Sequence, residues 1–159
     1  MAFAENTSVP VERTRAEIEK MIVTRHKCES FQSGIDFANR TAVVQFKAHA
    51  RFVRFIVTLP DPESKEIRLD RNGWARSPAQ RQRVREQAER TIWRALLLVI
   101  KAKLEAVDSK IATFEDEFLA QIVLPNDQTV GSVLAPMIAN AYDSGQMPSG
   151  LLALPAKGE

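Results

Sequence analysis

Hydrophobic positions that repeat or alternate predict one helix and three strands before Pro60. Apolar residues spaced three and four apart predict a helix over residues 10–26, which Pro10 would open. A T-x-x-E match from Thr14 to Glu17 also allows a start near Thr14. Strands are expected to follow over residues 29–35, 41–47 and 51–59. Because the joints between these strands are short, we expect antiparallel hairpins and a three-stranded antiparallel sheet.

A long helix is predicted over residues 77–110. Ser77 suits the N-cap, Pro78 suits the first helical position, and Gln80 stands where a capping box needs Glu or Gln. The first half of this helix is rich in arginine, whereas residues 95–100 are apolar on every face. Because a helix that is apolar all round is normally buried, we expect the second half to fill a core from which the first half projects.

Capping residues predict two shorter helices in the C-terminal part of the chain. Thr113 can cap a helix that runs through Gln121, and Thr129 can cap a last helix that ends near Ser144. Pro136 lies inside the last helix, which predicts either a kink or a later start. The expected class is α+β, with the order α-β-β-β-α-α-α and helices on one face of the antiparallel sheet.

The length and composition of the chain predict one domain over residues 1–159. With 45% hydrophobic and 26% charged residues, the chain can bury one core. Three segments lack a regular pattern. They are predicted to be a flexible N-terminal tail over residues 1–9, a long basic loop over residues 61–76 and an irregular C-terminal tail over residues 146–159.

Charge is segregated along the chain although the net charge is only +2. Residues 65–103 carry eleven Lys and Arg against four Asp and Glu, whereas residues 104–159 carry two against eight. This asymmetry indicates an electrostatic partner better than the whole-chain charge does.

The basic segment supplies the main candidate binding residues. Arginine dominates it, and the guanidinium group suits two-pronged contacts with phosphate or carboxylate. An aromatic residue in the loop could stack on a base. The candidates are Lys65, Arg68, Arg71, Trp74, Arg76, Arg81, Arg83, Arg85, Arg90 and Arg94. Two other interpretations stay open: a solvated helix face whose own carboxylates satisfy the arginines, and a docking surface for an acidic protein.

A second candidate surface lies on the third predicted strand. Phe52, Arg54 and Ile56 share one side of this strand. If the helices cover the other side, this face presents aromatic, aliphatic and cationic groups together. Such a face could bind a single-stranded nucleic acid or form a subunit interface, and we favour the interface.

Catalysis, metal binding and cofactors are not predicted. The chain has no nucleophile elbow, phosphate-binding loop, dinucleotide fingerprint or zinc-protease motif. Its only His and Cys residues are His26, Cys28 and His49, which lack metal-ligand spacing. The acidic run over residues 115–117 fits a helix N-terminus. One cysteine, no signal-peptide pattern and no apolar run long enough to span a bilayer lead us to expect a cytoplasmic protein without a membrane partner.

Four segments, over residues 9–19, 95–107, 113–118 and 145–148, resemble a widespread family of small uncharacterised proteins encoded by tailed bacteriophages and prophages. The resemblance covers most of the chain and implies action inside a bacterial host. That family has no assigned activity, so it transfers no functional residue. The order of one helix, three strands and a second helix is also similar to that of a double-stranded-RNA-binding domain. The long helix here is longer, however, and lacks the lysine-rich start of those domains.

Together these features predict a non-enzymatic phage accessory protein that binds nucleic acid through its basic loop and helix. The alternative is a host-interaction protein that inhibits a bacterial defence complex through protein–protein contact. A third hypothesis is a homo-oligomeric structural protein, because the segregated charge would permit subunits to associate.

Overall fold

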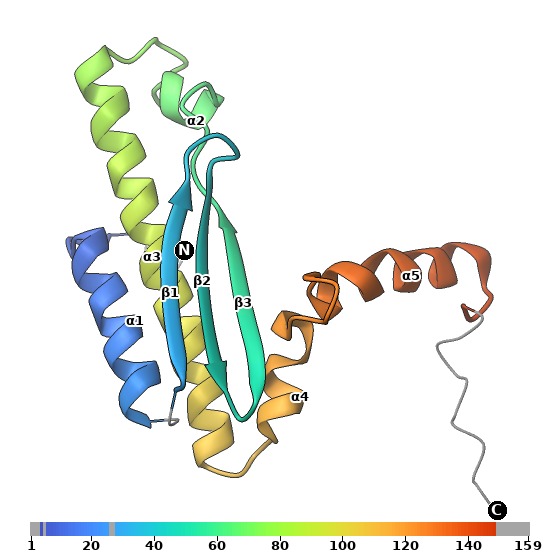
Figure 1. Cartoon of the computed structure of the whole chain (residues 1–159). Coiled ribbons are helices and arrows are strands. Elements are labelled where there is room, and N and C mark those ends of the chain that lie inside the picture. Colours follow the sequence, from blue (N-terminus) through green and yellow to red (C-terminus); the bar gives the residue numbers. More distant parts are fainter. Residues whose placement is uncertain (1–3, 5, 26–27, 149–159) are drawn as a thin grey trace, which may run out of the picture.

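An antiparallel meander of three strands forms one layer of the molecule (Figure 1). The computed structural model describes residues 4, 6–25 and 28–148 of the chain. Its strands, paired in sequence order, are β1 (Ser30–Asp36), β2 (Thr41–Ala48) and β3 (Arg51–Thr58). The predicted hairpins are confirmed, and each strand end lies within one residue of its predicted position.

One face of the sheet is buried and the other is largely open. In the register of the sheet, Phe46 lies opposite Val53 and Val44 lies opposite Phe55, and all four side chains are buried. This alternation of buried and exposed positions is what the period of two along a strand produces. The buried face therefore belongs to the core, and the opposite face carries Phe52 and its neighbours.

Two helices cover the buried face of the sheet, α1 (Val11–Arg25) and α3 (Pro78–Asp108), and they lie side by side (Figure 1). α1 contributes Ile18 and Ile22 to the core, and α3 contributes Trp93 among other residues. The predicted two-layer α+β class is confirmed: sheet in one layer, helices in the other.

The start of α3 follows the prediction, but the burial of its second half does not. The capping box of Ser77 and Gln80 is present, and residues 78–92 contribute no buried side chain. In the apolar run, however, Val99 is 46% exposed and Ala95 is exposed as well. The expectation that this run is buried on every face is wrong. α3 is an outer helix of a two-layer fold, so only the side toward the sheet is covered.

The predicted order of elements is wrong in two places. The segment expected to be a loop over residues 61–76 contains a one-turn helix, α2 (Lys65–Arg68), whose Ile67 is buried. The helix expected from Thr113 to Gln121 divides into α4 (Phe114–Phe118) and the 3₁₀ turn η1 (Leu119–Gln121). Elements this short have no hydrophobic period that a sequence pattern could reveal.

α4 closes the lower end of the core with aromatic rings. Phe118 packs edge-on against Phe46 and Phe55 at centroid distances of 6.0 and 6.3 Å. Phe114 stacks on Phe118 at 4.6 Å and on His49 at 4.5 Å. Such contacts fix α4 against the sheet.

The last helix, α5 (Val130–Ser144), projects away from the two layers (Figure 1). Its Thr129 cap and its left-handed Gly145 end follow the prediction. The helix runs through Pro136 from its predicted start, so the later start is excluded. None of its residues is buried. In the described part of the chain, no helix is long and apolar enough to cross a membrane.

The two predicted tails lie only partly within the described residues. In the N-terminal one, Ala4 is buried, and the Gln87 side chain of α3 donates a hydrogen bond of 2.9 Å to the Thr7 carbonyl. In the C-terminal one, residues 146–148 are not helical, and residues 149–159 lie outside the described residues.

Candidate nucleic-acid interface

The end of the molecule beyond the sheet is built from α2, the loop over residues 69–77 and the first turns of α3 (Figure 1). We call this region the cationic tip. It contains six of the predicted cations and one exposed indole. Its residues are Lys65, Arg68, Arg71, Trp74, Arg76, Arg81 and Arg83.

The loop of the cationic tip is held by its own backbone. Leu69 and Ala75 form an isolated β-bridge, and the Asp70 amide donates to the Trp74 carbonyl at 2.8 Å. The Asp70 carboxylate accepts from two loop amides, including that of Trp74, at 2.9 Å. Gly73 takes φ +82°, a left-handed conformation that glycine adopts without strain. The Trp74 side chain is 75% exposed on this ordered loop.

Two arginines of the cationic tip connect its parts. The Arg76 guanidinium donates to the Glu66 carbonyl at 2.6 Å and to the Ile67 carbonyl at 3.3 Å. Arg81 Nε donates to the Arg76 carbonyl at 3.0 Å. These acceptors are neutral, so the hydrogen bonds position the two guanidinium groups without cancelling their charge.

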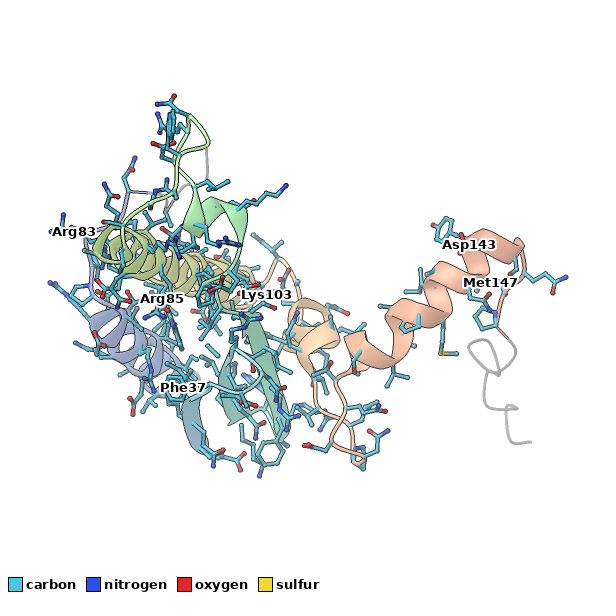
Figure 2. The ribbon with its side chains drawn as sticks, turned by 90° about the horizontal axis from the view of Figure 1, so that it is seen from above. Phe37, Arg83, Arg85, Lys103, Asp143 and Met147 are labelled. Atoms are coloured by element: carbon cyan, nitrogen blue, oxygen red, sulfur yellow. The ribbon has the colours of Figure 1, made fainter. Side chains whose placement is uncertain are left out.

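Three cations of the cationic tip point into solvent. The side chains of Lys65, Arg71 and Arg83 are exposed, and within the described residues they make no hydrogen bond or ion pair. Figure 2 looks down on this end and shows Arg83 at the outer edge of α3. Arg83 and Arg76 also line a small open pocket of about 230 Å³ together with Gln80. These three side chains are the accessible positive charge of the region.

The remaining predicted arginines each contact another group of the protein. Arg68 lies 3.8 Å from Glu63, and Arg85 lies 3.7 Å from Glu89. Arg94 contacts Glu17 of α1 at 2.6 Å and joins the two helices. Arg90 donates to the amide oxygen of Gln87 at 2.6 Å. The structure therefore separates the ten predicted residues into an open tip and three arginines further along α3. Arg85 and Arg90 contact residues of α3 itself, and Arg94 contacts α1.

The predicted surface on β3 has the expected orientation but a different electrostatic character. Phe52 and Ile56 are 44% and 59% exposed on the face away from α1 and α3. Arg54 is not available on that face, because its guanidinium contacts the Asp127 carboxylate at 2.6 Å and the Gln45 side chain at 2.7 Å. The hydrogen bond and the charge of Arg54 also lower the pKa of Asp127. This pair fastens the turn before α5 to the sheet.

The side chains that could bind a metal ion do not converge in the described part of the chain. No set of three or more His, Cys, Asp and Glu side chains there could hold a metal ion. The Cys28 thiol donates to the Ser30 carbonyl at 2.8 Å, and His49 stacks on Phe114. His26 lies outside the described residues.

Comparisons with known proteins give no relative for this arrangement: no protein-family model, no curated protein and no solved structure matches the chain. The geometry of the molecule is therefore the basis for the functional argument.

Sequence reasoning missed the open apolar surface of α5. The signal was present, since apolar residues recur at spacings of three and four over residues 130–142. We interpreted that pattern only as a helix, because periodicity does not reveal whether an apolar face finds a cover in the fold.

Proposed function

We propose that the protein binds nucleic acid through the cationic tip and catalyses no reaction. The observation that supports this most is the presence, at one end of the molecule, of three exposed cations, Lys65, Arg71 and Arg83, and the exposed indole of Trp74. Exposed cations release counterions when they neutralise phosphates, which drives association without sequence preference. The indole adds a stacking surface for a base.

The order of the loop gives this proposal a second support. Trp74 sits on backbone that three hydrogen bonds and a glycine turn hold in place. Arg76 and Arg81 are likewise oriented by carbonyl acceptors that leave their charge intact. A ligand would therefore meet an indole on ordered backbone and two guanidinium groups that are already positioned, which lowers the ordering entropy that opposes binding.

The test is fluorescence anisotropy with labelled single-stranded DNA, single-stranded RNA and duplex DNA. Reversing both free arginines, Arg71→Glu with Arg83→Glu, should weaken binding by roughly tenfold or more at moderate salt, because two phosphate contacts become repulsive. The matched control is Arg51→Glu with Lys101→Glu. It makes the same charge change at two exposed positions outside the cationic tip and should retain most of the affinity.

Tryptophan fluorescence supplies an independent reading. The two tryptophans differ sharply, since Trp74 is 75% exposed and Trp93 is 1% exposed. Stacking on a base should quench only the Trp74 emission, and Trp74→Leu should remove the quenching.

Equal affinity of the tip variant and the control variant would contradict the proposal. So would an absence of binding to all three nucleic acids. Capture of an acidic protein at the same arginines from nuclease-treated bacterial lysate would instead favour the rival host-interaction hypothesis.

A further inference from the structure

α5 presents an apolar stripe of which no residue is fully buried and two are exposed to solvent. The stripe repeats at spacings of three and four along one side of the helix. It consists of Val133, Leu134, Met137, Ile138, Ala141 and Tyr142. Ile138 is 49% exposed and Tyr142 is 86% exposed. Figure 2 shows the helix extending from the body to its far end at Asp143, with Met147 just beyond it.

A helix of this length needs a cover to be stable. Isolated helices of about 15 residues are marginal in water, and most helical stability in proteins comes from packing an apolar side. The base of α5 is anchored, because Gly131 packs closely on Ala120 and the Arg54–Asp127 pair holds the preceding turn. The anchored base presents the stripe at a fixed place but does not bury it.

We propose that the stripe is covered by the α5 helix of a second copy of this chain, paired antiparallel about a two-fold axis. α5 has no basic residue and a single acidic one, Asp143. Its stripe is therefore uncharged and fits an equally uncharged surface, which its own copy supplies. The antiparallel direction places the two Asp143 carboxylates and the two negative helix ends far apart, whereas a parallel pair would bring them together.

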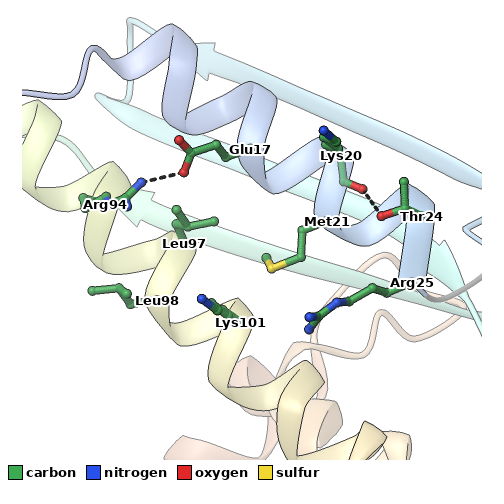
Figure 3. A pocket seen from close by; sticks show the side chains of 9 residues that line it. All are labelled: Glu17, Lys20, Met21, Thr24, Arg25, Arg94, Leu97, Leu98 and Lys101. Carbon is green, nitrogen blue, oxygen red and sulfur yellow. Dashed lines mark hydrogen bonds and ion pairs between the residues drawn. The ribbon is translucent and has the colours of Figure 1, made fainter.

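The main rival cover on the body of the protein is the groove between α1 and α3 (Figure 3). This groove has a volume of about 320 Å³ and an apolar floor of Met21, Leu97 and Leu98. Cationic side chains, Lys20 and Lys101 among them, border it. α5 could offer these cations only one carboxylate. Seating the stripe there would remove charges from water with little compensation, so pairing of two α5 helices is favoured.

The area of contact sets the strength of the pair. α5 is about 22 Å long and about 10 Å wide, so half of its lateral surface is roughly 350 Å² per copy. A pair would bury roughly 700 Å², below the roughly 1,200 Å² of stable interfaces. The inferred dimer is therefore weak and reversible at micromolar concentrations or above. The proposal concerns a surface remote from the cationic tip and does not depend on nucleic-acid binding.

Sedimentation equilibrium over a wide concentration range tests the pairing. The mass should rise from 17.8 kDa toward twice that value as concentration rises. Leu134→Asp with Ile138→Asp should weaken association by roughly tenfold or more, because two charges enter the stripe. Ser132→Asp with Ala139→Asp adds the same charges to other sides of the same helix and should leave association unchanged. Circular dichroism checks that both variants keep their helix content.

Disulfide trapping in a Cys28→Ser background tests the direction. In an antiparallel pair, the middle residue of one helix meets its own counterpart, so Met137→Cys should cross-link. Val130→Cys, at the start of the helix, should not, because it would face the far end of the partner.

Several results would overturn the proposal. A constant monomer mass would exclude pairing. An equal loss of self-association in the stripe variant and in the control variant would exclude the stripe as the contact surface. Efficient cross-linking of Val130→Cys would exclude the antiparallel direction. Loss of association in Lys20→Glu with Lys101→Glu would assign the cover to the groove between α1 and α3.

Discussion

The cationic tip and α5 are both exposed to solvent, but they differ in the polarity of their surfaces and in the contacts that hold them. The tip is polar and is tied together by its own groups: Arg76 and Arg81 hold its segments, and Asp70 holds its loop. α5 is apolar, none of its residues is fully buried, and Ile138 and Tyr142 are exposed to solvent. One region thus has stable local structure and open charge, whereas the other has open apolar surface whose stability needs a cover.

Neither the charge nor the hydrophobicity of a segment of sequence is therefore enough to identify a binding surface. Of ten candidate residues in the basic segment, Arg94 supports the packing of α1 on α3, and only Lys65, Arg71 and Arg83 are free cations within the described structure. Conversely, a helix with hardly any charge exposes large apolar side chains, Ile138 and Tyr142.

Salt should separate the two regions most strongly. If about three phosphates are neutralised at the cationic tip, one for each free cation, raising salt from about 50 to 200 mM should lower the affinity for duplex DNA roughly 40-fold. Association through α5 should change little over the same range, because its stripe is uncharged. Anisotropy and sedimentation in the same buffers check this. If nucleic-acid affinity and self-association both fell steeply with salt, this difference between the two regions would be disproved.

Removing a structural arginine should have the next largest effect. Arg76→Ala deletes two charged hydrogen bonds to the carbonyls of Glu66 and Ile67, so we expect a loss of about 1–2 kcal/mol in the free energy of unfolding. Arg83→Ala removes an unpaired exposed side chain and should change that free energy by less than about 0.5 kcal/mol. Urea unfolding measures both. Equal losses would show that Arg83 also supports the fold.

The base of α5 should be sensitive to a single methyl group. A Cβ added at Gly131 would lie 2.8 Å from the Ala120 carbonyl oxygen. Overpacking of this kind costs about 1–3 kcal/mol, which exceeds the gain of about 1 kcal/mol in helix propensity. Gly131→Ala should therefore speed hydrogen exchange of the α5 amides and leave the cationic tip unchanged.

Gly34→Ala is the matched control, because a Cβ at that position meets no atom within 4 Å. Unchanged exchange in α5 after Gly131→Ala would show that the helix base shifts without cost.

The smallest expected effect is a pH dependence of the local stability of the turn before α5. Arg54 lowers the pKa of Asp127 in the folded protein. The ion pair therefore stabilises the folded state at pH values above the pKa that Asp127 has in the unfolded chain. This contribution is lost as the pH falls below about 4 and then through the folded pKa. Hydrogen exchange at residues 123–129 should rise modestly in that range. The rise should be absent in Arg54→Gln, and an equal rise in that variant would exclude the pair as its cause.

Much of the fold could be predicted from the sequence because its signals are local. Ser77, Thr113 and Thr129 act as helix caps through hydrogen bonds to residues three positions away. The alternation in residues 51–58 determined which side of β3 is buried. The short helix α2 was not predictable in this way. Its formation depends on burying Ile67 beside the N-terminal end of α3 rather than on a repeating pattern.

The candidate site could be predicted only as a segment. The sequence identified the basic stretch and Trp74, but the pairing of Arg94 with Glu17 joins residues far apart in the chain. The same holds for Arg54, which the sequence placed on an open face and the fold ties to Asp127. The phage setting and the activity stay predictions.

Sequence patterns alone were enough to place the start of each strand and of the longer helices, the apolar side of β3 and the concentration of charge, because each depends on neighbours along the chain. Which arginines remain free, that Val99 faces solvent, and that Ile138 and Tyr142 of α5 are exposed could be learned only from the folded arrangement. Those outcomes depend on which surfaces pack together in the folded protein. The pattern of a short stretch of sequence does not show which distant segment will pack against it.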